Sequence, residues 1–388
     1  MIIVDAAIIR VLAIGLSYIV NLTIINMVSK ETAGQYFLYL AWSSLVTVIL
    51  VGGYSKYIVR ELAKNYNYEI ALRNSSYKYV TIIFIIATLI ALLVASQKIE
   101  LAILAITIPL LIYLSVESAL LRGKGNHVWG NVEGQIIRPV ILLILLYFGL
   151  TAIDEISILY LISLYAVGII LSSTLWFVLV TPKKRLTETK LYKFDFKSLN
   201  NLTVISVAEL AFLQLDIILL GFLMTNESIA EYKVALLVRM ALLVPQQALL
   251  MVLPYLLAKS PKTLYTHYLR FINLAVGTIG LIVNFSAGEM LIGLAFGEGY
   301  GHVSKYLYPY FVMMLCLGLI GPASEALIAV HRDYIVRKAA IYCIILNSAM
   351  LILTVPVYGI QAAIFSGASS YTLFYVICFW HRKYVKTA

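Results

Sequence analysis

Charged side chains are scarce in this sequence. Aspartate, glutamate, lysine and arginine make up 12% of the 388 residues, whereas 62% of the residues are hydrophobic. A water-soluble domain carries about 25% charged and about 45–50% apolar residues, so this composition excludes an ordinary soluble enzyme and a disordered chain. The mean hydropathy is +0.94, and one span needs about 20 apolar residues. The chain is therefore expected to cross a lipid bilayer repeatedly.

Patterns for disulfides and metal sites are also missing. The three cysteines, Cys316, Cys343 and Cys378, lie within apolar stretches and form no CxxC motif, which argues against a disulfide framework. The five histidines are scattered without the spacing of metal ligands. The sequence predicts neither a metal site nor a bound cofactor.

Long apolar runs dominate the chain instead. They fall at about 9–28, 35–58, 78–96, 101–121, 135–150 and 156–180 in the first half, and at about 201–224, 231–258, 269–296, 305–329, 339–357 and 359–380 in the second. These runs are continuous, whereas membrane β-barrels need short strands of alternating polarity. We therefore predict an all-α polytopic membrane protein with twelve transmembrane helices.

The basic residues predict how these helices are oriented. If the N-terminus is cytoplasmic, 20 of the 29 lysines and arginines fall in cytoplasmic segments and three fall in outside loops. Such an excess on the cytoplasmic side is typical of membrane proteins. The net charge of +10 is therefore interpreted as an orientation signal and not as a nucleic-acid-binding surface, and both termini are expected to be cytoplasmic.

The longest polar loop divides the chain into two halves. We expect an N-terminal six-helix bundle at 1–182, a basic cytoplasmic linker at 183–200 and a C-terminal six-helix bundle at 201–388. A weak internal repeat supports this division, because Leu-Ala-Lys ends the second run at 62–64 and the eighth at 257–259. Parallel halves are a known transporter construction with the substrate site between them, so the two bundles are expected to surround a central cavity.

Short motifs recur at characteristic places along these runs. They are Ser29–Phe37 before the second run, Val59–Lys64 at its end, Leu121–Gly125 after the fourth, Leu215–Gly221 and Ala230–Tyr232 in the seventh and eighth, and Phe296–Tyr300 and Ile352–Ala363 further on. Over nearly its whole length the chain resembles the polysaccharide-unit flippases (Wzx-type O-antigen and capsule transporters) of the multidrug/oligosaccharidyl-lipid/polysaccharide (MOP) superfamily. One departure is Asn26, which stands where the family often has a basic residue.

The resemblance implies a function in a bacterial cytoplasmic membrane. Members of this family move an undecaprenyl-pyrophosphate-linked oligosaccharide from the inner to the outer leaflet by alternating access, for which an ion gradient is a candidate driving force. The implied partners are membrane lipids, the lipid-linked oligosaccharide and the polysaccharide polymerase machinery.

One group of ionisable residues is expected in the second half. Asp216 lies eight residues before the end of the seventh run and Arg239 lies eight after the start of the eighth, so a short turn would place them level, about 12 Å below the outer face. Glu209, Gln246 and Gln247 continue this polar strip. Two interpretations stay open: an Asp–Arg pair that fixes the two helices, or an arginine that receives pyrophosphate beside an acidic residue that releases it.

A second polar group is expected near the cytoplasmic face. Its members are Arg10, Ser17, Asn21, Glu117 and Arg138. Arg138 precedes Pro139, where a kink is expected. Arg10, Arg138 and Arg239 are the candidates for a cationic substrate-binding cavity, while snorkelling of Arg10 and Arg138 to the interface is the alternative.

Carboxyl groups at membrane depth are candidates for ion coupling. They are Glu117, Glu209, Asp216, Glu289 and Glu325. A carboxyl group in a medium of low dielectric constant has a raised pKa and can exchange protons near neutrality. A simple charge pair, for Glu325 with Arg337 or Lys338, is the alternative.

Two other functions are alternatives. A polytopic polymerase or glycosyltransferase would need catalytic residues in an outside loop, but these loops are short and carry no acidic pair or Ser/His/Asp arrangement. A proton- or sodium-coupled multidrug exporter of the MATE type would share the fold, but its cavity should favour carboxylates for cationic drugs. The sequence therefore predicts a flippase and not an enzyme.

Overall fold

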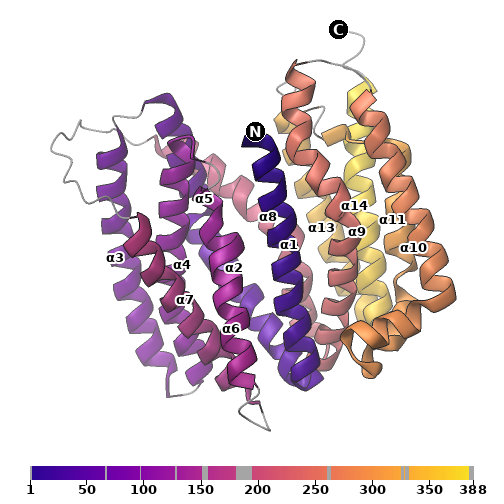
Figure 1. The fold of residues 1–388 in the computed structure, drawn as a ribbon, viewed down its shortest axis with the longest axis horizontal. Coiled ribbons are helices and arrows are strands. Elements are labelled where there is room, and N and C mark those ends of the chain that lie inside the picture. The colour runs from indigo at the N-terminus through magenta and orange to yellow at the C-terminus, as the bar shows by residue number, and fades with distance from the viewer. Residues whose placement is uncertain are drawn as a thin grey trace. The chain divides into compact units, whose positions relative to one another are not determined.

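The computed structural model describes residues 2–65, 68–96, 98–126, 129–150, 156–180, 195–259, 264–324, 327 and 332–383. The described chain is helical and contains no strand within these ranges (Figure 1). This confirms the predicted all-α fold class.

The helices follow the order of the apolar runs. The first part of the chain forms α1 (Ile2–Met27), α2 (Lys30–Lys64), α3 (Glu69–Val94), α4 (Ile99–Gly123), α5 (Trp129–Val132), the π-helix η2 (Glu133–Ile137), α6 (Arg138–Leu150) and α7 (Ile158–Val180). The second forms α8 (Phe196–Leu223), α9 (Asn226–Lys259), α10 (Leu264–Phe296), the 3-10 helix η3 (Glu298–Tyr306), α11 (Tyr308–Ile320), α13 (Asp333–Tyr358) and α14 (Ile360–Lys383).

Most of these helices are long and apolar enough to cross a membrane. Among the described residues eight helices meet this requirement, and η3 with α11, which meet at a bend of 47°, make a ninth if they are one span. Shorter apolar helices cover Val11–Met27 in α1 and Gln214–Leu223 in α8. The chain is thus a multi-pass membrane protein.

The helix α2 is longer than the apolar run that predicted it. Its 35 residues span about 52 Å at 1.5 Å per residue, whereas the hydrocarbon core of a bilayer is about 30 Å thick. The additional turns carry charged side chains at both ends, including Lys30, Glu31, Arg60, Glu61 and Lys64. The expected bounds of 35–58 were too narrow because hydropathy marks the apolar part of a helix and not its polar ends.

The π-helix explains a second difference from expectation. The fifth span was expected at 135–150, but the helical segment begins at Trp129 and includes a π turn at Glu133–Ile137. Pro139 follows this turn directly. Proline has no N–H to donate and its ring collides with the carbonyl four residues earlier, so a wider turn before it relieves the backbone. The helical segment therefore begins before the π turn, at Trp129, and continues through Pro139, where a kink was expected.

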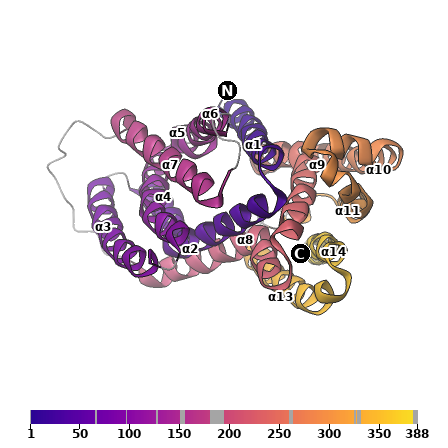
Figure 2. The same ribbon diagram turned by 90° about the horizontal axis from the view of Figure 1, so that it is seen from below.

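The chain divides into two compact units. Unit 1 contains Met1–Val28 and Leu38–Leu210, and unit 2 contains Ser29–Phe37 and Ala211–Ala388. In unit 1, α4 packs against α3 and α7, and α6 packs against α7 and α1 (Figure 2). In unit 2, α14 packs against α13, α11 and α9. Residues 183–194 of the expected linker lie outside the described residues, so the boundary expected at 183–200 stays a prediction.

Two glycines of α2 allow a close approach of two helix backbones, one of them within unit 2 and the other within unit 1. A Cβ atom on Gly34 would lie 1.7 Å from the backbone oxygen of Asn226, the first residue of α9, in unit 2. A Cβ atom on Gly53 would lie 2.4 Å from the Cα atom of Thr203 in α8, in unit 1. Only glycine allows backbones to approach so closely. The opening turns of α2 therefore pack tightly on α9, and its middle packs tightly on α8.

Candidate functional site

Unit 2 contains a buried cluster around Asp216 of α8. This residue is 2% exposed, and Arg239 of α9 is 7% exposed. The Tyr232 hydroxyl donates to Asp216 Oδ2 at 2.8 Å, and Asn347 Nδ2 donates to Oδ1 at 2.6 Å. Both carboxylate oxygens are thus satisfied by neutral donors from two other helices, α9 and α13.

The cluster extends from Asn347 to α14. The side-chain oxygen Oδ1 of Asn347 accepts hydrogen bonds from Ser366 Oγ at 2.6 Å and from Ser370 Oγ at 3.4 Å. Asn347 thus connects Asp216 of α8 to Ser366 and Ser370 of α14 in one hydrogen-bond network. These neutral residues were not identified from the sequence, because a single asparagine or serine in an apolar helix has no distinctive spacing.

Arg239 completes the cluster. Its guanidinium carbon lies 5.7 Å from the centre of the Tyr310 ring in α11, within the range of a cation–π contact. A Cβ atom on Gly367 would lie 3.6 Å from Arg239 Nη1, from Asp216 Oδ2 and from the Tyr232 hydroxyl. The predicted proximity of Asp216 and Arg239 is thus what the structure shows, within a network of neutral side chains.

The space within this cluster is very small. A cavity of about 10 Å³ is lined by Ala211, Leu215, Asp216, Arg239, Ile344, Asn347, Gly367 and Ser370. A cavity of this size is at the lower limit for one water molecule. A diphosphate group does not fit beside Arg239 in this conformation, so the assignment of Arg239 to substrate binding stays a prediction that requires the helices to open.

The remaining residues of the expected strip are only partly described. Gln246 of α9 is 2% exposed, and its Nε2 atom donates to the Tyr375 hydroxyl at 3.5 Å. The side chains of Glu209 and Gln247 lie outside the described residues. The polar strip can thus be followed from Asp216 and Arg239 to Gln246.

A second charged site lies in unit 1, at the π turn. Arg138 Nε donates to Glu133 Oε1 at 3.0 Å, and Arg138 Nη2 donates to Oε2 at 2.7 Å. This bidentate geometry is the strongest arrangement of an arginine and a carboxylate. The Glu133 side chain is 1% exposed and the Arg138 side chain is 25% exposed. Glu133 was not predicted as a site residue, because in a regular α-helix it would point away from Arg138.

A third charged site joins α3 to α4 in unit 1. Glu117 is 1% exposed, accepts a hydrogen bond from the Tyr77 hydroxyl at 2.7 Å and lies 3.6 Å from Arg73 Nη2. Arg73 also pairs with Glu69 at 3.3 Å, and Lys124 pairs with Glu69. Glu117 and Arg138, expected at a similar depth, therefore have separate partners.

The other expected residues are placed as follows. In α1, Asn21 Nδ2 donates to the backbone oxygen of Ser17 at 2.6 Å, and the side chain of Arg10 lies outside the described residues. Glu325 also lies outside them. Glu289 Oε2 lies 3.7 Å from Lys305 Nζ, and the Glu289 side chain is 64% exposed. This carboxylate is therefore not buried by the protein.

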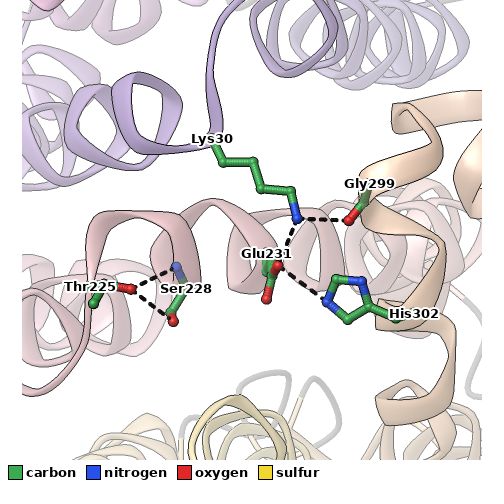
Figure 3. A network of polar contacts seen from close by, with 6 residues as sticks. All are labelled: Lys30, Thr225, Ser228, Glu231, Gly299 and His302. Carbon is green, nitrogen blue, oxygen red and sulfur yellow. Dashed lines mark hydrogen bonds and ion pairs between the residues drawn. The ribbon is translucent and has the colours of Figure 1, made fainter.

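A polar network in unit 2 holds the first turn of α2 (Figure 3). Lys30 Nζ lies 2.9 Å from Glu231 Oε1 and donates to the backbone oxygen of Gly299 at 2.7 Å. His302 Nε2 lies 3.2 Å from the same Glu231 oxygen, and Lys30 Nζ lies 4.8 Å from the centre of the Tyr300 ring. The start of α2 is thus tied to both α9 and η3.

The described residues contain no group of three or more His, Cys, Asp or Glu side chains that could hold a metal ion. The buried charged sites instead combine an arginine with carboxylate groups. They can recognise an ion or a polar headgroup, or stabilise helix packing.

The chain is similar to solved structures of two membrane transporters and of a lipid flippase. No protein-family model matches the chain, and no curated protein matches it. An inward-facing MATE-family multidrug resistance transporter of the MOP superfamily matches with a TM-score of 0.72 and 12% identity, over 95% of this chain and 94% of that one. A MOP-superfamily transporter from Pyrococcus furiosus matches with a TM-score of 0.68 and 13% identity, over 100% and 95%.

The lipid II flippase MurJ in an inward closed conformation also matches. Its TM-score is 0.72 at 14% identity, over 97% of this chain and 87% of that chain. Since identity is low and coverage is nearly complete, the likeness concerns the fold of the whole chain. The chain thus has the same helical fold as this MATE transporter and MurJ.

Proposed function

We propose that this protein is a flippase for a lipid-linked oligosaccharide carried on undecaprenyl pyrophosphate. The fold that it shares with MATE transporters and with a lipid II flippase supports transport across a membrane. The Wzx-type motifs along the chain favour a polysaccharide repeat unit as the cargo. In this proposal the unit moves from the cytoplasmic to the outer leaflet by alternating access.

One observation favours an anionic substrate. In each of the three intramembrane charge clusters the carboxylate is buried more deeply than the arginine. The side chains of Glu133 and Arg138 are 1% and 25% exposed, and those of Glu117 and Arg73 are 1% and 11% exposed. Arg138 is thus the more accessible member of its pair, and the planar guanidinium matches phosphate oxygens.

The second candidate is a multidrug exporter of the MATE type, because it has the same fold. Such a protein would transport cationic drugs, for which exposed carboxylates are the suitable partners. The burial of Glu117, Glu133 and Asp216 speaks against this candidate.

Reconstitution in vesicles distinguishes the two functions. The lipid substrate is an undecaprenyl-diphosphate-linked oligosaccharide with a nitrobenzoxadiazole label on its sugar, and dithionite added outside destroys only the label in the outer leaflet. We expect vesicles with the protein to lose nearly all label and empty vesicles to keep the inner-leaflet share. Transport of ethidium without lipid flipping would assign the protein to the exporters instead.

A further inference from the structure

The Glu133–Arg138 pair depends on the π turn. In an α-helix each residue is rotated by about 100° from the preceding one, so side chains five residues apart diverge by about 140°. In η2 the backbone N–H of Arg138 donates to the oxygen of Glu133, which is the bonding pattern of a π-helix. This turn brings positions 133 and 138 onto one face, where the two side chains can form their bidentate pair.

Stability alone does not account for this arrangement. A buried arginine–carboxylate pair contributes little net stability, because the attraction is offset by the loss of hydration. π turns are rare in proteins, and those that occur are often found at functional sites. Here the turn places a carboxylate that is 1% exposed beneath a guanidinium that is 25% exposed, in a segment that is apolar enough to span the membrane.

The two members of the pair differ in what they can still bind. The hydrogen bonds to Glu133 use Arg138 Nε and Nη2, which leaves Nη1 outside the pair. Glu133 is enclosed, since α1, α4, α6 and α7 all pack against η2. A ligand can therefore reach the arginine without first reaching the carboxylate.

We propose, resting on the function proposed above, that Glu133 is an internal counter-anion that occupies Arg138 until the diphosphate of the lipid-linked substrate displaces it. Carboxylate and phosphate oxygens accept the same pair of parallel N–H bonds from a guanidinium. Arg138 then has an anionic partner in both states and is never left uncompensated in the membrane. The exchange also selects the substrate, because only a ligand with adjacent anionic oxygens can replace the carboxylate.

The sign of one mutational effect tests this exchange. Glu133→Gln keeps the size of the side chain and removes the competing charge. We expect the full-length variant, purified in detergent, to bind undecaprenyl diphosphate about tenfold more tightly than the wild type, because a binding group that is mostly occupied lowers the apparent affinity by its free fraction. If Glu133 only holds Arg138 in position, the same substitution weakens binding.

The controls separate this effect from general changes. Glu61→Gln removes the partner of Arg60 in another arginine–glutamate pair of unit 1 and is expected to leave the affinity unchanged. Undecaprenol, which has no phosphate, should bind wild type and Glu133→Gln equally. Glu133→Asp keeps the charge but shortens the side chain, and it should raise the affinity about twofold to threefold. If Glu133→Gln does not fold, Glu133→Asp shows whether weakening the pair raises or lowers the affinity for undecaprenyl diphosphate.

The outcomes are distinct from those of the flipping assay. Tighter binding of undecaprenyl diphosphate by the Glu133 variants supports the exchange, even if the vesicles show no flipping. Weaker binding, unchanged binding, or no binding by any form overturns it, even if the vesicles flip lipid. Inorganic pyrophosphate is the second ligand: tighter binding of pyrophosphate alone would overturn the assignment to a lipid-linked diphosphate.

Discussion

The close approach of Gly34 to the backbone of Asn226 allows a test of the packing of α2 on α9. The test substitution is Gly34→Ala, which adds one methyl group at the start of α2. The new Cβ atom would lie 1.7 Å from the backbone oxygen of Asn226 and 2.5 Å from its carbonyl carbon. Since the obstacle is backbone and not the end of a flexible side chain, the collision can be relieved only if the helices move apart.

The size of the effect follows from this distance. Real Cβ atoms essentially never approach other atoms closer than 3.0 Å, so the two backbones must separate by about 1.3 Å in a densely packed region. Overpacking costs about 1–3 kcal/mol and occasionally more, and a backbone collision belongs at the upper end. For a unit of this size, about 3 kcal/mol lowers the melting temperature by roughly 6–12 °C.

The assay is thermal unfolding in detergent, followed by size-exclusion chromatography with fluorescence detection. The matched control is Gly15→Ala in α1, where no atom lies within 4 Å of the added Cβ. Removing a glycine from a helix stabilises it by about 0.5–1 kcal/mol, so this variant should unfold at the same temperature or slightly higher. Equal melting temperatures for Gly34→Ala and the wild type would refute the proposed contact between α2 and α9.

Further substitutions test three of the charged sites. Asp216→Ala should destabilise unit 2 by about 3–5 kcal/mol, because it leaves Arg239 as a buried charge. Adding Arg239→Leu should restore most of this lost stability. If thermal unfolding shows no recovery in the double variant, Asp216 and Arg239 are not coupled. Glu117→Gln should cost about 1–3 kcal/mol in the same measurement, and an unchanged melting temperature would show that its bonds are not formed. Glu231→Gln should cost about 1 kcal/mol or less. In a double-mutant cycle it should lower the cost of Lys30→Ala without removing it, because Lys30 also contacts Gly299 and Tyr300; additive effects would argue against the pairing of Lys30 with Glu231.

The sequence carried enough information to locate the helices. The apolar runs match the described helices in order, because an α-helix needs about 20 apolar residues to cross the bilayer. The proximity of Asp216 and Arg239 was also predictable, since a tight turn between α8 and α9 places residues at equal distances from it at equal depth. Asn347 could not be assigned to this cluster in advance, because its contact with Asp216 joins residues 131 positions apart.

The charged sites of unit 1 were harder to predict. Arg138 was identified, but Glu133 was not, because a spacing of five residues separates side chains in an α-helix and joins them only in a π turn. Pro139 was a usable signal, although it indicated a kink and not a wider turn. Arg73 and Glu117 meet through the packing of α3 on α4, which no local pattern encodes.

The most direct test of the central claim is the leaflet distribution of a labelled undecaprenyl-diphosphate-linked oligosaccharide in vesicles that contain the protein. With the wild-type protein, dithionite should destroy nearly all of the label, and Arg138→Gln should slow this loss. If the inner-leaflet label stays protected in vesicles whose protein is folded and inserted, the protein does not flip this class of lipid.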